Sequence, residues 1–332
     1  PTPNSGRLIK CLSMDDDFLN RNDSRRVLVV GDTMLDRYWI GDVTRVSPEA
    51  PVPIVNIGEV RECAGGAGNV AANIASLGAG CELLSFIGDD AAGRRLSELL
   101  AQAGVDRHFH IDTYGRTTEK LRIVSRNQQL LRADFESRPS AQLLEQSVAD
   151  FREISQTVDS IVISDYGKGG LAYIEQMIQI ARDREIPVIV DPKGADYARY
   201  RGATLVTPNR DEFALATGVA TDDPAFSDTA HGLVEAADLG GLLVTRGEQG
   251  MTLFLASGEV IHQDATAREV FDVSGAGDTV VAVISVGIAA GLSWAECIKW
   301  ATRGASAVVG RFGTSVVRPS DLTLDPQGEG LR

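Results

Sequence analysis

Short apolar runs alternate with amphipathic segments along most of the chain. Each apolar run ends in a polar or glycine-rich cluster, which predicts buried strands of a mostly parallel sheet with helices on both faces. The predicted strands are 25–32, 81–90, 159–166, 186–194, 203–209 and 241–247. The predicted helices are 68–77, 92–102, 141–154, 171–183, 210–217 and 230–238. The pattern therefore indicates the α/β class.

Two segments interrupt this alternation. Residues 37–62 and 107–135 contain β-rich stretches without a helical pattern, and the prolines of the first segment suit edge strands. We expect both to form a small β-sheet that projects from the main sheet as a lid or a dimer contact. Residues 1–24 are polar and aperiodic and predict a flexible arm, so that 25–325 form a single domain.

Polar residues follow the ends of the predicted strands. Ligands of open α/β sheets bind beyond the carboxyl ends of the strands, although loops are polar for other reasons as well. The residues at these positions are Asp32, Asp89, Asp165, Asp191, Asn209 and Arg246.

The segment "DVSGAGD" (272–278) precedes thirteen residues without a charge. It predicts a turn through Gly275 and Gly277 into a buried helix, whose first amides have no helical partner and attract anions. Glycine lets a phosphate approach these amides without a Cβ in the way. Asp278 is then either a catalytic carboxylate or a residue that neutralises the helix dipole.

A second glycine pair, Gly65 and Gly66, also leads into a helix. Asn69 follows it and offers a donor and an acceptor to a hydroxylated ligand. Asp36 lies shortly after the first strand, where it either accepts hydrogen bonds from two sugar hydroxyls or belongs to a surface loop.

Other nucleotide-binding motifs do not fit. Residues 88–95 have Walker A glycine spacing, but Arg94 and Arg95 stand where Lys and Ser or Thr belong. The GxG segments 65–78 and 275–280 lack the third glycine of the dinucleotide fingerprint.

The net charge of −14 argues against nucleic acid and anionic membranes as partners. Four scattered cysteines suggest neither a disulfide framework nor a zinc site, and no apolar run reaches the roughly 18 residues that span a bilayer. We expect a cytoplasmic protein.

Residues 116–138 contrast with this acidic chain, because they contain six basic and three acidic side chains. Such a segment suits an anionic substrate, and the alternative is a solvated strand face. Lys120 and Arg122 are two residues apart and share a face if they lie on a strand.

Three motifs in order carry a resemblance: Gly65-Gly66 with Asn69, the N-x-x-E of "TPNRDE" (207–212), and the D-x-x-G-A-G-D of 272–278. With them the chain resembles the ribokinase, or PfkB, family of carbohydrate kinases over about 25–320. The resemblance implies a ribokinase-like three-layer α/β/α fold with a β-sheet lid, and phosphoryl transfer from ATP to a sugar. A homodimer through the lid is expected.

The resemblance also implies roles for single residues. Asp278 would be the base, and the amides of Gly275, Ala276 and Gly277 would face the transferring phosphate. Asn209 and Glu212 would organise Mg²⁺ through its waters. A requirement for a monovalent cation stays open. The expected nucleotide-binding residues are Asn209, Thr245, Arg246, Gly247, Gly304 and Gly313; an alternative for 301–313 is a packed helix and its exit loop.

Further segments, among them "SPEAPVPI" (47–54), "SDYGKG" (164–169) and "DPKG" (191–194), resemble the heptose 7-phosphate kinases of this family. These phosphorylate D-glycero-D-manno-heptose 7-phosphate at O1 in ADP-heptose synthesis for lipopolysaccharide core. Similar bifunctional enzymes continue into a nucleotidyltransferase domain, and the expectation here is the stand-alone kinase. The expected substrate-binding residues are Asp36, Gly65, Gly66, Asn69, Lys120, Arg122, Arg132, Asp165, Lys168 and Lys193.

Two alternatives remain. One is a kinase of another sugar or sugar phosphate, such as ribose or fructose 1-phosphate. The other is a non-catalytic sugar or nucleotide sensor, which could lose Asp278, whereas this chain retains it.

Overall fold

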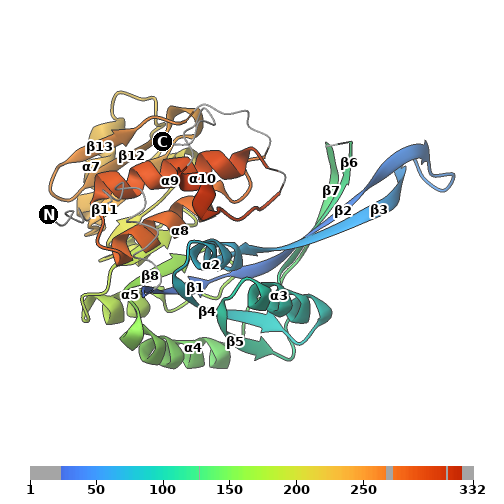
Figure 1. The fold of residues 1–332 in the computed structure, drawn as a ribbon, viewed down its shortest axis with the longest axis horizontal. Coiled ribbons are helices and arrows are strands. Elements are labelled where there is room, and N and C mark those ends of the chain that lie inside the picture. The colour runs from blue at the N-terminus through green and yellow to red at the C-terminus, as the bar shows by residue number, and fades with distance from the viewer. Residues whose placement is uncertain (1–23, 127, 267–271, 312, 324–332) are drawn as a thin grey trace, which may run out of the picture.

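The computed structural model describes residues 24–126, 128–266, 272–311 and 313–323. A nine-stranded sheet forms the centre (Figure 1). The seven neighbouring strands from β5 to β11 in this sheet are parallel to one another, whereas β12 runs antiparallel to β11 and β13 runs antiparallel to β12. The strands in spatial order are β13 (Val260–Gln263), β12 (Met251–Leu255), β11 (Gly241–Thr245), β10 (Leu205–Val206), β9 (Val188–Asp191), β8 (Ser160–Ser164), β1 (Arg26–Gly31), β4 (Gly80–Gly88) and β5 (Asp106–Asp112).

Helices cover both faces of this sheet and enclose two hydrophobic cores. Successive strand residues point to opposite faces, so Val27 and Val29 enter one core and Leu28 and Val30 enter the other. The first core contains residues of α2 (Ala67–Ser76), α3 (Ala91–Gln102), α8 (Ala276–Ala289), α9 (Trp294–Val309) and α10 (Pro319–Thr323). The second contains residues of α4 (Ala141–Ile154), α5 (Ile174–Arg182), α6 (Arg210–Thr217) and α7 (Phe226–Ala236). The predicted three-layer α/β/α fold is confirmed.

Helix α8 is the uncharged segment that follows the glycine turn. It is buried on nearly every side because α2, α9 and strands β1, β8 and β9 all pack against it. A helix that is apolar all round is typical of this central position.

The second sheet, which we call the lid sheet, has the order β3 (Pro53–Gly66), β2 (Thr33–Val46), β6 (Glu119–Ser125) and β7 (Gln128–Phe135). Figure 1 shows its strands extending well beyond the body of the molecule. Residues 107–112 were expected here, but they form β5 at the edge of the main sheet. Their alternating side chains explain the error, because half-buried edge strands and lid strands have the same pattern.

Two further boundaries differ from the sequence prediction. Strand β2 begins at Thr33 and β3 continues to Gly66, so the glycine pair ends a lid strand and leads directly into α2. The hairpin of β12 and β13 extends the main sheet and was not predicted. Among the described residues, none of the helices combines the length and the apolar character needed to cross a lipid bilayer.

Candidate active site

The polar residues after the strands lie at one edge of the main sheet, because the strands that precede them are parallel. Asp32 follows β1, Asp165 follows β8, and Asp191 ends β9. Helix α8 begins next to this edge, and the charge of its Asp278 acts on Asp191. The expected site therefore has a single location in the fold.

Asp278 lies in the first turn of α8 and is only 3% exposed. Asn69 Nδ2 donates to its Oδ2 at 2.7 Å, and the Tyr166 hydroxyl donates to its Oδ1 at 2.7 Å. Burial raises the pKa of Asp278 to about 6, although both hydrogen bonds oppose this shift. A carboxylate with a pKa near neutrality suits a general base.

The turn before Asp278 leaves three amides available. Gly275 has a φ of 79°, and the Ala276 amide bonds the Val273 carbonyl at 3.2 Å. Within the described part of the chain, the amides of Gly275, Gly277 and Asp278 have no acceptor, whereas the predicted Ala276 amide is already bonded. A Cβ added to Gly277 would meet no described atom within 4 Å, so open space lies beside these amides. Such a helix start can bind an anion.

The two glycines before α2 serve the site indirectly. A Cβ on Gly65 would lie 2.1 Å from Asp36 Oδ2, so the glycine makes room for the Asp36 side chain. Gly66 has a φ of 59°, and its Cβ would lie 2.5 Å from the Asp32 carbonyl. Both residues thus fix where α2 starts, and with it Asn69.

The amide of Asn69 is oriented by Asn73, one turn later on α2. Asn73 Oδ1 accepts from the Val317 amide at 2.8 Å, and its Nδ2 donates to the Asn69 carbonyl at 2.8 Å. The same Nδ2 lies 3.2 Å from Asn69 Oδ1. Asn69 must therefore direct its own Nδ2 toward Asp278.

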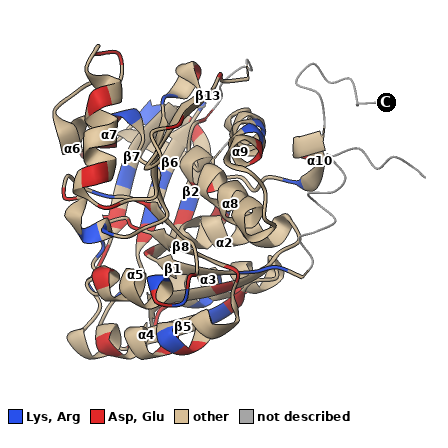
Figure 2. Cartoon of the chain, turned by 90° about the vertical axis from the view of Figure 1, so that its left-hand side faces the viewer, with Lys and Arg blue, Asp and Glu red and all other residues tan. Residues whose placement is uncertain are grey.

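Basic residues gather on one face of the lid sheet, which we call the site face. The strand register places Asp36 beside Lys120 and Tyr38 beside Arg122, with Arg132 next to Arg122 on β7. Arg122 pairs with Asp36 at 2.5 Å and lies over the Tyr38 ring at 5.0 Å. Lys120 and Arg122 thus share this face, as predicted for two residues of one strand. Figure 2 shows basic positions recurring along β2, β6 and β7.

Lys120 is the central cation of the site face. Burial lowers its pKa, and the charges of Lys168, Arg122 and Arg132 lower it further, while Asp36 opposes the change. Its ammonium lies 5.6 Å from the centre of the Tyr166 ring. Among the described residues no carboxylate pairs with it. The arrangement favours an added anion.

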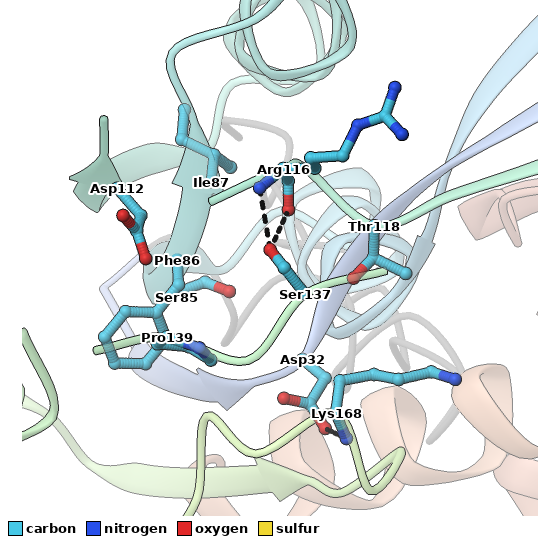
Figure 3. Close-up of a pocket in the computed structure, with 10 residues that line it drawn as sticks. All are labelled: Asp32, Ser85, Phe86, Ile87, Asp112, Arg116, Thr118, Ser137, Pro139 and Lys168. Atoms are coloured by element: carbon cyan, nitrogen blue, oxygen red, sulfur yellow. Dashed lines mark hydrogen bonds between the residues drawn. The ribbon is translucent and has the colours of Figure 1, made fainter. Parts of the chain in front are cut away.

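Two other predicted substrate-binding cations already have partners. Lys168 pairs with Glu136 at 2.6 Å, and Arg132 binds Asp134 through two nitrogens at 2.8 and 3.0 Å. Figure 3 shows a pocket lined by residues at the carboxyl ends of β1, β4 and β5 and by the loops beside them, with Ser137 near its centre; the side chains of Lys168 and Arg116 point away from Phe86.

Asp165, another predicted substrate ligand, makes its hydrogen bonds within the protein. Tyr200 donates to its Oδ2 at 2.9 Å, the Gly167 amide donates to its Oδ1 at 2.9 Å, and Arg199 lies 3.3 Å away. These contacts hold the loop after β8.

Asn209 and Glu212 form a capping box at the start of α6. Asn209 Oδ1 accepts from the amides of Asp211 and Glu212 at 2.9 Å each, and Glu212 Oε2 accepts from the Asn209 amide at 3.1 Å. Lys193, expected near the sugar, instead pairs with Glu212 Oε1 at 3.0 Å. No group of three metal-ligating side chains occurs in the described residues. These oxygens fit Mg²⁺ only through its water ligands.

The remaining predicted nucleotide-binding residues surround the end of β11. Thr245 is bridged to Asn209, and Arg246 bonds the Thr221 carbonyl at 3.2 Å and lies 5.1 Å from the centre of the Phe226 ring. Gly247 has a φ of 60° and open space around it. The position of Gly247 therefore leaves room for a ligand.

Gly304 and Gly313 have packing reasons to be glycine. A Cβ on Gly304 would lie 3.2 Å from both Thr279 and Val283, so this glycine permits close contact of α9 with α8. Gly313 has a φ of 69°, and its amide donates to Asp272 at 2.9 Å. The packed-helix alternative accounts for Gly304, and no contact of either residue indicates an adenine pocket.

Sequence reasoning missed Tyr166 and Asn73 as parts of the site. Tyr166 lies within "SDYGKG" as the last residue of a predicted strand, so its position was a usable signal. Asn73 lay in an Ala-rich helical segment and carried no such signal, because its role depends on Val317, which is far away in the chain.

Comparisons with known proteins show the family of this chain. A family model described as pfkB family carbohydrate kinase matches residues 24–321. The D-beta-D-heptose 7-phosphate kinase of Bordetella bronchiseptica is 50% identical over 298 residues, which are 90% of this chain and 95% of that protein. The bifunctional protein HldE of Methylococcus capsulatus is 45% identical over 304 residues, but the matched part is only 64% of that protein.

Solved structures show the same fold. Phosphofructokinase-2 from Escherichia coli in complex with potassium matches with a TM-score of 0.75 and 21% identity, and Arabidopsis thaliana ribokinase complexed with ribose and ATP with 0.72 and 20%. Each match covers 90% of this chain and 97% of the other. At these sequence identities the matches show similarity of fold alone.

Proposed function

The chain belongs to the pfkB family of carbohydrate kinases, and from this premise we propose that it transfers phosphate from ATP to O1 of D-glycero-D-manno-heptose 7-phosphate. The product would be the heptose 1,7-bisphosphate of ADP-heptose synthesis. The observation that carries the proposal is a buried carboxylate, Asp278, at a helix start with amides left unbonded by the described residues, within reach of the charge of Lys120 on the lid sheet.

The choice of sugar is supported from two sides. The Bordetella relative, at 50% identity, is named for heptose 7-phosphate. The site face supplies Lys120 without an acidic partner among the described residues, which suits the 7-phosphate and gives a neutral sugar such as ribose no advantage. Arg122 also lies on this face but is paired with Asp36.

The residues of the chain divide the reaction between them. Asp278 accepts the proton of O1 as O1 attacks the γ-phosphorus, and the amides of Gly277 and Asp278 stabilise negative charge on the phosphoryl oxygens. The bond from the γ-phosphorus to the bridging oxygen breaks, and ADP leaves with the electron pair. Asp36, beside Gly65, is placed to accept hydrogen bonds from sugar hydroxyls.

Mg²⁺ is part of this proposal and would neutralise charge on the ATP phosphates. Glu212 and Asn209 would hold it through water, because their oxygens already cap α6. Thr245, Arg246 and Gly247 would lie on the nucleotide side. ATP as the phosphoryl donor makes the cytoplasm the proposed location, and a monovalent cation remains to be tested by its effect on turnover.

A homodimer through the lid sheet is also proposed. Register places Val60, Trp39, Ile123 and Leu131 in one row across the face opposite the site face. Val60 is 54% exposed and Leu131 57% exposed, so an apolar stripe lies open in a single chain. A second copy of the lid sheet would cover it.

Leu131→Asp should therefore abolish dimer formation, because it would bury a charge in that contact. Sedimentation velocity should give the dimer mass for the unsubstituted protein and the monomer mass for the variant. Leu215→Asp on α6, where Leu215 is 63% exposed, is the matched control and should remain dimeric. An unsubstituted protein that sediments as a monomer would contradict the dimer.

The catalytic proposal is tested by ADP release. Purified protein is mixed with ATP, Mg²⁺ and D-glycero-D-manno-heptose 7-phosphate, and parallel reactions contain the heptose without phosphate, fructose 1-phosphate or ribose. We expect the highest kcat/KM with the heptose 7-phosphate, no turnover without Mg²⁺, and a new phosphate on C1 by ³¹P NMR.

Each other outcome has a definite meaning. Higher kcat/KM with another sugar would keep the kinase and overturn the substrate. Binding of ATP and sugar without turnover of any sugar would overturn the kinase in favour of a sensor.

A further inference from the structure

The hydroxyl of Tyr166 touches the proposed base directly. It donates to Asp278 Oδ1 at 2.7 Å, opposite the Asn69 amide on Oδ2. In the proposed phosphoryl transfer, Tyr166 neither accepts the proton of O1 nor contacts the phosphoryl oxygens. Its contacts, however, reach three parts of the site: the base, the site face of the lid sheet and the glycine loop.

Tyr166 is held firmly in place. Its backbone amide donates to Asp32 Oδ2 at 3.1 Å, and the same carboxylate accepts from the amides of Lys168 at 2.8 Å and Gly170 at 3.1 Å. Asp32 is 6% exposed. A buried carboxylate thus anchors the loop that carries Tyr166 to the end of β1.

The ring of Tyr166 is fixed as well. One edge lies against Gly66, where an added Cβ would be 3.3 Å from Tyr166 Cε2. The Lys120 ammonium lies over the ring at 5.6 Å from its centre. The hydroxyl therefore has little freedom to leave Asp278.

We propose that Tyr166 is a positioning residue of the phosphoryl transfer, which fixes the plane of the Asp278 carboxylate by bonding one oxygen while Asn69 bonds the other. A carboxylate bonded at one oxygen can rotate about its Cβ–Cγ bond, since this torsion has broad minima. A carboxylate bonded at both oxygens cannot. The inference rests on the proposed function of Asp278 as the base.

Tyr166 keeps its own proton during the reaction. Burial, followed by the charge of Asp278, raises the pKa of Tyr166 well above its ordinary value. The proton of the sugar O1 consequently passes to Asp278 and not to Tyr166, while O1 bonds the γ-phosphorus and the bond to ADP breaks. Tyr166 remains a hydrogen-bond donor throughout.

The hydroxyl also affects when the base is ionised. The charged and titratable groups that act on Asp278 are Asp36 from β2 and Lys120 from β6, together with Asp191 from β9. Their signs differ, and the hydrogen bonds from Asn69 and Tyr166 are the larger effects that favour the ionised form. Removal of the hydroxyl should therefore raise the pKa of Asp278.

Tyr166→Phe is the test, because it keeps the ring under Lys120 and removes only the hydroxyl. We expect the acid limb of the profile of kcat against pH to move to higher pH by about one unit, which is the effect of one hydrogen bond to a charged group. On the alkaline plateau kcat should fall about tenfold as the base loses a restraint. The KM of the sugar phosphate should stay close to that of the unsubstituted protein.

Tyr197→Phe is the matched control. Tyr197 is also buried, and its hydroxyl has no partner among the described residues. This control should keep the original pH profile and plateau. An unshifted acid limb in Tyr166→Phe, or an equal loss in the control, would overturn the inference.

A double-mutant cycle covers the case in which Tyr166→Phe is poorly folded. If Tyr166 acts through Asp278, adding Tyr166→Phe to Asp278→Asn should leave the residual rate unchanged. A further tenfold loss in that background would overturn the positioning role. If the unsubstituted protein prefers another sugar, the proposed substrate fails, but the same cycle can be measured with that sugar.

Discussion

The base and the lid sheet satisfy their polar groups in opposite ways. Both carboxylate oxygens of Asp278 accept hydrogen bonds from protein donors, and Asn69 is itself oriented by Asn73. On the site face, Lys120 has no acidic partner among the described residues, and other cations surround it. The base is thus complete in the free protein, whereas on the site face Asp36 is paired with Arg122 and Lys120 is left without an ion pair among the described residues.

This difference separates the reaction from the choice of substrate. A buried hydrogen-bonded network at the end of a central helix is preorganised, so it can serve any sugar hydroxyl that reaches it. A projecting sheet can change its side chains at little cost to the core. We infer that the main sheet determines the phosphoryl transfer and the lid sheet determines which sugar is accepted.

The largest effect is expected for Asp278→Asn, which removes the base but retains its shape. The kcat should fall by about 10² to 10⁴, the usual contribution of a general base. At the same time the free energy of unfolding of the variant should be higher than that of the unsubstituted protein at pH 7. The carboxyl has a pKa of about 6 when folded and an ordinary value of 3.8, so the folded state binds the proton more tightly and loses stability as the pH rises from about 4 to 6.

At pH 7 this loss is at most about 3 kcal/mol, which the amide would recover. Urea unfolding at pH 7 measures the gain, and it should shrink at pH 4, where Asp278 is protonated. A variant that is inactive and also less stable would indicate a structural role for Asp278 and would remove the contrast with the lid sheet.

A smaller effect is expected for Gly277→Ala. The added methyl group enters open space and should leave the melting temperature unchanged, but it would obstruct the approach of a phosphate to the amides. We expect kcat/KM to fall about 10²-fold, as for loss of one preorganised donor. Gly291→Ala, which also meets nothing within 4 Å but has a φ of 76°, is the contrasting control: it should lower stability and spare activity.

The smallest effect is expected on the lid sheet. Lys120→Met should raise the KM of the sugar phosphate about tenfold, the value of one charge-assisted hydrogen bond, with kcat nearly unchanged. The KM of the heptose without phosphate should not change. Lys299→Met, at an exposed position of α9, is the control. An equal rise in KM for both sugars would contradict a phosphate contact at Lys120.

Periodicity and motif spacing predicted much of this protein. The six buried strands, the helices between them and the glycine turn before Asp278 all follow from local patterns of apolar residues and glycine. The errors occurred where contacts with residues distant in the sequence determine the structure. Residues 107–112 pair with β4 in the main sheet and not with the lid sheet, and edge strands of either sheet have the same alternating pattern.

The roles of single polar residues were harder to predict for the same reason. Lys193 lies in the loop "DPKG" after β9, and its local sequence does not indicate that its ammonium pairs with Glu212 of α6. Gly304 looked available to a nucleotide, yet it permits contact between α8 and α9. A local pattern shows that a residue is polar or small, but it does not show which distant group that residue contacts in the fold.

The sequence by itself determined the layered fold and the family, and it placed a carboxylate at the start of a buried helix, because these depend on short-range periodicity and spacing. Only the tertiary structure decided that Tyr166 and Asn69 hold that carboxylate, and that Lys120 stays without an acidic partner in the described residues. The two contacts with Asp278 join side chains that are more than a hundred residues apart, and the surroundings of Lys120 come from other strands and loops, so only the folded chain brings these groups together.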